Sequence, residues 1–117
     1  MAYTKKARVF GRPRNQRRAL MRSLARSLVL EERISTTEAK AKELRPFIER
    51  LITHAKKNTL ASRRLVQARI GDAVATKKLF DTIAPRYATR AGGYTRVVKR
   101  ARRGANDART LAYIALV

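Results

Sequence analysis

The chain has 117 residues, the size of one ordinary domain, and carries 29 lysine and arginine residues against 8 acidic residues. Its formal net charge of +21 and pI of about 11.8 would make the compact state repel itself, so a polyanionic partner is expected. The absence of cysteine excludes disulfides, Cys-based metal sites and thiol catalysis, and no apolar stretch is long enough for a membrane span.

Residues 1–15 are predicted to form an extended basic arm, and residues 16–117 a single α+β domain. The cations of the arm are Lys5, Lys6, Arg8, Arg12 and Arg14. Gly11 and Pro13 interrupt any periodicity, and the segment contains no acid. Because such a segment buries little apolar surface, we expect it to become ordered on its partner.

A helix is predicted from about residue 16. Leu20, Leu24 and Leu28 recur at every fourth position and form an apolar ridge. The arginine ridge, with the same spacing, consists of Arg14, Arg18, Arg22 and Arg26. It is offset by two residues, which is about 200° of helical rotation, so the arginines are expected opposite the leucines. Such a helix can bury leucine and present arginine to a partner.

A short strand is predicted at residues 33–36, with Ile34 pointing inward. Ser35 and Glu38 have the spacing of a capping box and predict the start of a long helix. The apolar face of that helix consists of Leu44, Ile48, Leu51, Ile52 and Ala55. Pro46 is expected to kink or break the helix near Arg45.

Two shorter helices are predicted at residues 60–70 and 73–84. The pairs Asn58-Thr59 and Gly71-Asp72 each supply a stop signal followed by an N-cap. Pro85 is expected to end the second helix. The aromatic residues assigned to the core are Phe47, Phe80 and Tyr113.

Strands are predicted at residues 94–100 and 110–117, joined as a hairpin by a long basic loop. The second strand is apolar on both faces, so it is expected in the middle of the sheet. The predicted fold class is α+β, with helices packed on one small three-stranded mixed sheet.

The charge is segregated along the chain. Residues 1–30 and 86–105 contain no acid, although solvated surfaces normally mix both signs. Two basic surfaces that hold a nucleic acid from two sides are therefore predicted. The candidate RNA-binding residues are Lys5, Lys6, Arg8, Arg12, Arg14, Arg18, Arg22, Arg26, Arg86, Arg90, Arg96, Lys99, Arg100, Arg102 and Arg103.

The excess of arginine over lysine favours RNA, because guanidinium groups bind phosphate in a bidentate manner and stack on bases. Tyr87 and Tyr94 flank Arg90 and either stack on bases or pack at the edge of a strand. A nucleoid-associated or other DNA-binding protein is the alternative, since the arginine ridge could enter a major groove.

No enzymatic activity is expected. His54 is the single histidine, without cysteine or carboxylate at metal-ligand spacing, and the chain has no nucleophile-elbow motif. Gly92-Gly93 is not followed by the lysine and hydroxyl residue of a phosphate loop, and it is interpreted as a turn. We therefore predict no catalytic residue, metal, cofactor or small-molecule substrate.

Three stretches resemble a known family. Residues 32–46 (ERISTTEAKAKELRP) closely resemble the signature segment of bacterial ribosomal protein 17 of the large subunit, and LIT at 51–53 continues the match. LFD at 79–81, IAPRY at 83–87 and GGYTR at 92–96 resemble its second block. RRG at 102–104 and the apolar tail at 112–117 resemble its end. The similarity extends from about residue 19 to residue 117.

The resemblance implies a large-subunit ribosomal protein that contacts rRNA near the exit of the nascent-chain tunnel. It also implies a three-stranded sheet, a cytoplasmic or organellar ribosome as location, and neighbouring proteins such as ribosomal protein 32 of the large subunit as partners. The N-terminus departs from the pattern, since Gln16-Arg17 stands where the family commonly has His-Arg.

Overall fold

The computed structural model describes the backbone of residues 14–103 and 110–117, and the side chains of the same residues except 101–103. The predicted arm cations Lys5, Lys6, Arg8 and Arg12 lie outside the described residues. In chain order the elements are α1 Arg14–Glu31, β1 Arg33–Thr37, α2 Glu38–Lys57, α3 Leu60–Ile70, α4 Ala73–Lys78, the π-helical segment η1 Leu79–Ile83, α5 Ala84–Arg86, β2 Thr95–Arg103 and β3 Thr110–Leu116.

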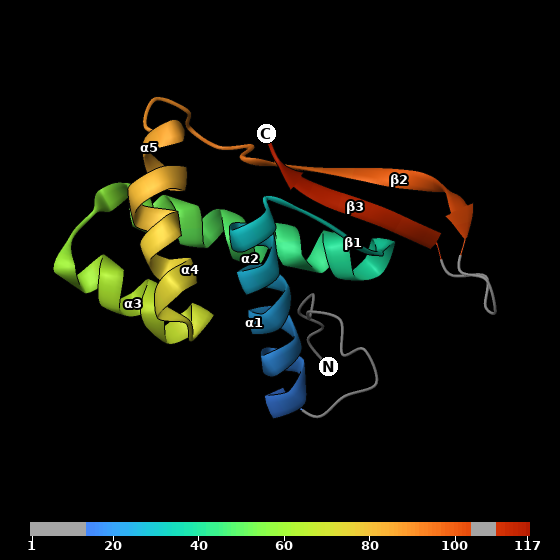
Figure 1. Cartoon of the computed structure of the whole chain (residues 1–117), viewed down its shortest axis with the longest axis horizontal. Helices are drawn as coiled ribbons and strands as arrows, with labels where there is room; N and C mark the ends of the chain where they lie inside the picture. Colours follow the sequence, from blue (N-terminus) through green and yellow to red (C-terminus); the bar gives the residue numbers. More distant parts are fainter. Residues whose placement is uncertain (1–13, 104–109) are drawn as a thin grey trace, which may run out of the picture.

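The structure is α+β, with helices gathered against one face of a three-stranded sheet (Figure 1). The strand order is β1-β3-β2, which confirms that β3 lies in the middle and pairs with β2 as a hairpin. Both pairings are antiparallel, so the expected mixed sheet is wrong in that detail. No helix in the described part of the chain combines the length and hydropathy that crossing a membrane requires.

Helix α2 is the central element, because it packs against the sheet and against α1 and α3. Its predicted apolar face is confirmed, with Leu44, Ile48, Leu51, Ile52 and Ala55 all buried. The N-cap is Thr37 instead of Ser35: the Thr37 side chain accepts a hydrogen bond from the backbone N–H of Lys40. Ser35 is still paired within β1, so it cannot cap the helix.

A kink or a break was expected at Pro46, and the break is wrong, because α2 runs without interruption from Glu38 to Lys57. Pro46 lacks the N–H that would bond one turn back, but it lies on the exposed side of the helix. The packing of Leu44 and Ile48 on either side of Pro46 keeps the helix continuous.

Helix α1 begins at Arg14, two residues earlier than predicted. Its buried residues are Ala25, Leu28 and Val29, whereas Leu24 is partly buried against the core. Glu32 follows with φ +64° and donates its N–H to the carbonyl of Leu28 at 2.7 Å. This left-handed residue turns the chain from α1 directly into β1.

The predicted caps of the remaining helices are confirmed, but Pro85 does not end the last one. Thr59 forms a reciprocal capping box with Ser62, and Asp72 caps α4 through the N–H of Val74. Gly71 ends α3 in the left-handed conformation, with φ +71°. The segments α4, η1 and α5 form one helical run that passes Pro85 and ends at Arg86, two residues beyond the predicted end.

Tyr87 and Tyr94 close the end of the sheet. Both are buried, and their ring centroids are 5.2 Å apart. The Tyr87 hydroxyl donates to the Val117 carbonyl at 2.6 Å, and Lys56 donates to the Tyr94 hydroxyl at 3.0 Å. Of the two predicted roles, packing at a strand edge is therefore the one observed, and neither ring is available for base stacking.

Replacing Pro46 with alanine should stabilise the protein by about 1–3 kcal/mol, because alanine restores a helical N–H and removes an interior proline. The exposed position leaves little packing to lose. Urea unfolding followed by circular dichroism measures the change. A lower midpoint for Pro46→Ala would show that the proline ring makes an interaction that outweighs the missing hydrogen bond.

Candidate nucleic-acid interface

The arginine ridge of α1 is exposed, as predicted, but it does not lie opposite the buried face. Arg14, Arg18, Arg22 and Arg26 are all exposed. The helix buries Ala25 and Val29 in preference to Leu20, which moves the buried stripe toward the arginines. Arg22 and Val29 are seven residues apart and therefore differ by only about 20° around the helix axis. The ridge thus borders the contacts that α1 makes with α2 and α3.

Arg22 has a structural role in addition to its charge. Its Nη2 donates to the backbone carbonyl of Ala68 in α3 at 3.1 Å. A Cβ placed on Gly71 would contact the Arg22 side chain at 3.6–3.8 Å, so the arginine also lies over the turn that ends α3. Arg22 therefore links α1 to the C-terminal end of α3.

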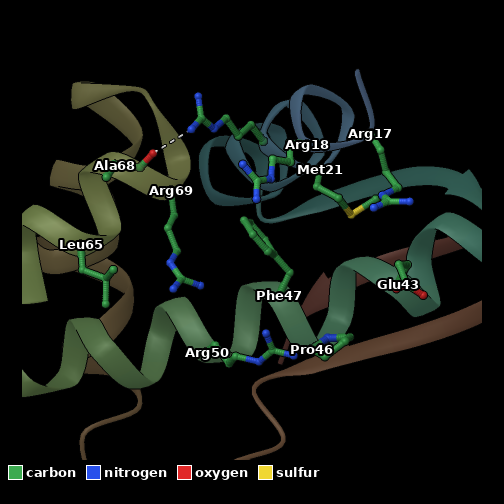
Figure 2. A pocket seen from close by; sticks show the side chains of 11 residues that line it. Arg17, Arg18, Met21, Glu43, Pro46, Phe47, Arg50, Leu65, Ala68 and Arg69 are labelled. Carbon is green, nitrogen blue, oxygen red and sulfur yellow. Dashed lines mark hydrogen bonds between the residues drawn. The ribbon is translucent and has the colours of Figure 1, made fainter. Parts of the chain in front are cut away.

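A groove of about 550 Å³ lies where α1, α2 and α3 meet (Figure 2). The residues that line it are Arg17, Arg18, Met21, Arg22, Glu43, Pro46, Phe47, Arg50, Leu65, Ala68 and Arg69. Phe47 extends from α2 toward Arg18, and Arg69 extends from α3 toward α2. Phe47, predicted to belong to the core, is only partly buried, because one side of its ring contacts the core and another lines this groove.

Sequence reasoning missed Arg17, Arg50 and Arg69 as members of this site. Arg50 and Arg69 lie in the middle part of the chain, where acids are also present, so segregation of charge did not point to them. Arg50 follows Phe47 by three residues and Arg69 follows Leu65 by four, which places each arginine beside an apolar groove residue on its own helix. That spacing was the available signal, but only the tertiary packing of three helices brings the two pairs together.

A second basic surface covers the sheet face that is turned away from α2. Ala112 and Ile114 of β3 are buried toward the helices, so the alternating residue Tyr113 lies on the opposite face. The Arg33 guanidinium stacks over the Tyr113 ring, 4.0 Å from its centroid. Tyr113 was predicted to belong to the core, and this prediction is wrong, because the residue lies on the outer face.

Two of the predicted RNA-binding arginines share this outer sheet face. Arg96 is opposite Ala115 in the register, and Arg100 lies four residues, or two alternations, further along β2. Both are exposed, and Arg100 donates to the Ser35 hydroxyl at 2.9 Å. Lys99 alternates to the other side, where its Nζ is 3.5 Å from a carboxylate oxygen of Glu38. The backbone of Arg102 and Arg103 continues β2, while their side chains lie outside the described residues.

Arg86 is not brought together with the other candidates. Its guanidinium donates to the Glu32 carboxylate, which also lies 3.3 Å from Lys78 Nζ. The hydrogen bond from Arg86, with a further one from Lys78, lowers the pKa of Glu32 below its ordinary value of 4.5. This cluster links the residue after α1 to α4 and α5. Arg90 is exposed in the following loop, and its Nε donates to the Gly92 carbonyl.

The described residues contain no group of three or more His, Asp or Glu side chains that could hold a metal ion. Together, the fold and these surfaces define a small, strongly basic α+β protein with an arginine-lined groove and a basic sheet face. The family Ribosomal protein L17 matches residues 20–117. The chain belongs to this family, which confirms the resemblance found in its sequence.

Individual relatives agree with the family match. A protein of Hydrogenobaculum sp. named large ribosomal subunit protein bL17 is 53% identical over 117 residues, which is 100% of this chain and 99% of the relative. The protein of the same name from Novosphingobium aromaticivorans is 51% identical, over 94% of this chain and 77% of the relative. The one from Thermomicrobium roseum is 48% identical, over 100% of this chain and 99% of the relative.

Glu32→Gln should lower the free energy of unfolding at pH 7, because it removes the carboxylate that binds Arg86 and Lys78. Glu32 has a depressed pKa in the folded state, so its stabilisation is present above pH 4.5 and is lost as the pH falls through the folded-state pKa. The difference between wild type and variant should therefore shrink below pH 4.5. Urea unfolding across pH 3–7 measures it, and a difference that stays constant over this range would contradict the assignment.

Proposed function

We propose that this protein is a structural constituent of the large ribosomal subunit that binds rRNA. The observation that carries the proposal is a net charge of +21 on an L17-family chain, with the segments 1–30 and 86–105 containing no acid. The names of its relatives place those proteins in the large subunit. The role is binding and scaffolding, and it needs no catalytic group.

The contacts are made by the segments that the charge pattern indicates. The arm, with Lys5, Lys6, Arg8 and Arg12, enters RNA ahead of α1. Arg14, Arg18, Arg22 and Arg26 then bind phosphates along α1, since guanidinium groups suit bidentate phosphate contact. The hairpin contributes Arg96 and Arg100 at the outer sheet face, together with Lys99, Arg102 and Arg103 of β2. Arg90 is added from the loop that precedes β2. Arg86 contributes mainly by holding the fold, because its guanidinium is bound to Glu32.

The family resemblance supports a finer location, near the exit of the nascent-chain tunnel. Neighbouring large-subunit proteins, among them ribosomal protein 32, would be partners there. The groove is formed by α1, α2 and α3, whereas the outer sheet face is turned away from α2, so the two surfaces can serve different neighbours.

Fractionation of ribosomes on a sucrose gradient tests the proposed function directly. We expect the protein to co-sediment with the large subunit at moderate salt. Competition at one fixed salt concentration complements this test, with rRNA expected to displace the protein from duplex DNA of equal length. Absence from the large subunit, or preference for duplex DNA, would refute the proposal and favour a DNA-binding protein.

Replacing Arg18, Arg22 and Arg26 with glutamine should weaken rRNA binding and reduce the slope of log K against log salt by about one unit per lost phosphate contact. A control variant, Lys57→Gln with Arg64→Gln and Lys77→Gln, removes the same charge from exposed positions outside the arginine ridge. Equal slope changes in the two variants would show that bulk charge, and not the α1 surface, determines binding. Thermal unfolding of both proteins reports any loss from the Arg22–Ala68 hydrogen bond.

A further inference from the structure

The groove between α1, α2 and α3 combines cations with an accessible aromatic ring, which a surface that only binds phosphates does not need. Arg18, Arg50 and Arg69 line it from three different helices, and Figure 2 shows Arg69 extending from α3 toward α2. Within the described residues none of these three takes part in an ion pair, whereas Arg45 and Arg86 are both paired with glutamates. Glu43 is the single acid among the lining residues.

The groove also has an apolar floor. Phe47 is partly buried against the core, and Met21 and Leu65 lie beside it. Its volume of about 550 Å³ falls within the roughly 300–1,000 Å³ that pockets for small organic ligands occupy. A duplex offers mainly its backbone to a protein groove, so its phosphates would leave the Phe47 ring without a partner. An acidic peptide would likewise match the charge but not the flat ring.

An unpaired nucleotide matches both the arginines and the aromatic ring of the groove. A splayed base stacks on aromatic side chains and on guanidinium planes, and its flanking phosphates bind arginine. We propose that the groove receives one unpaired nucleotide of the rRNA, with its base against Phe47 and its phosphates on Arg18, Arg50 and Arg69. This inference rests on the proposed function, since it presumes that rRNA is the partner.

Two of the helices around the groove are joined by a hydrogen bond. Arg22 of α1 donates to the Ala68 carbonyl of α3 at 3.1 Å, which ties the two helices together beside the groove. The ring of Phe47 is held on its inner side by the core, so little side-chain freedom remains to be lost when a base stacks on it. Arg22 is therefore a positioning residue, and Phe47 is the residue that contacts the base.

The test uses the full chain bound to its large-subunit rRNA. Ultraviolet crosslinking followed by mass spectrometry should link the peptide that contains Phe47 to a single nucleotide in a loop or bulge. Chemical probing should show that nucleotide protected in the complex. Phe47→Leu, which keeps an apolar side chain, should weaken binding by about tenfold, the effect of one lost stack, and restore reactivity at that nucleotide. Phe47→Tyr should behave as wild type.

A second pair of variants keeps the proposal testable if Phe47→Leu fails to fold. Arg50→Gln with Arg69→Gln leaves the core intact, and it should expose the same nucleotide to the probe. The control, Arg64→Gln with Lys77→Gln, removes two exposed cations that do not line the groove and should leave the protection in place.

The possible outcomes separate this inference from the proposed function. If wild type binds rRNA but Phe47→Leu and the Arg50 and Arg69 variant leave affinity and protection unchanged, the groove inference is overturned while the function stands. Crosslinks from the Phe47 peptide to paired nucleotides, or to a neighbouring protein in the assembled subunit, would overturn it as well. If wild type does not bind rRNA at all, the proposed function itself fails.

Discussion

The structure depends on the burial of α2 on both of its sides. Ala112 and Ile114 of the sheet pack on one side of this helix, and α1 and α3 pack on the other. Leu44, Ile48 and Leu51 are therefore fully enclosed, which is the main source of cohesion in a chain whose charges repel one another. The exposed edge of the same helix carries Phe47 and Arg50, so the element that holds the core together also forms the floor of the groove.

The acids of the described chain act mostly within the fold. Glu32 joins the end of α1 to Arg86 and Lys78, and Glu38 pairs with Lys42 at the start of α2. Glu49 accepts a hydrogen bond from the Thr95 hydroxyl at 2.7 Å, which connects α2 to the first residue of β2. Carboxylates placed in this way neutralise cations at the joints between elements and leave the α1 and groove arginines available for phosphate.

Much of the fold could be predicted from the sequence, because local signals agree with the tertiary structure. The period of Leu44, Ile48 and Leu51 gave α2, and the pair Gly71-Asp72 gave the boundary between α3 and α4. The errors arise where tertiary packing overrides a local rule. Pro46 was expected to kink or break α2, which runs without a break, and the alternation of β3 gave no indication that Tyr113 would lie on the outer face. The charge pattern predicted the exposed ridge of α1, but Arg50 and Arg69 join it only through the packing of three helices.

Pro46 belongs both to the core helix α2 and to the lining of the groove. An interior proline removes a helical hydrogen bond, yet here it lies on the exposed edge of α2, at the groove and directly before Phe47. A residue that violates a local rule without a gain in packing is the kind of feature expected at a binding surface, where selection acts on the partner as well as on stability. The arginines that line the groove have the same character, since like charges repel one another in the free protein and a bound polyanion would relieve that repulsion. Binding of phosphate should therefore raise the stability of the whole fold, because a ligand that prefers the native state shifts the unfolding equilibrium toward it.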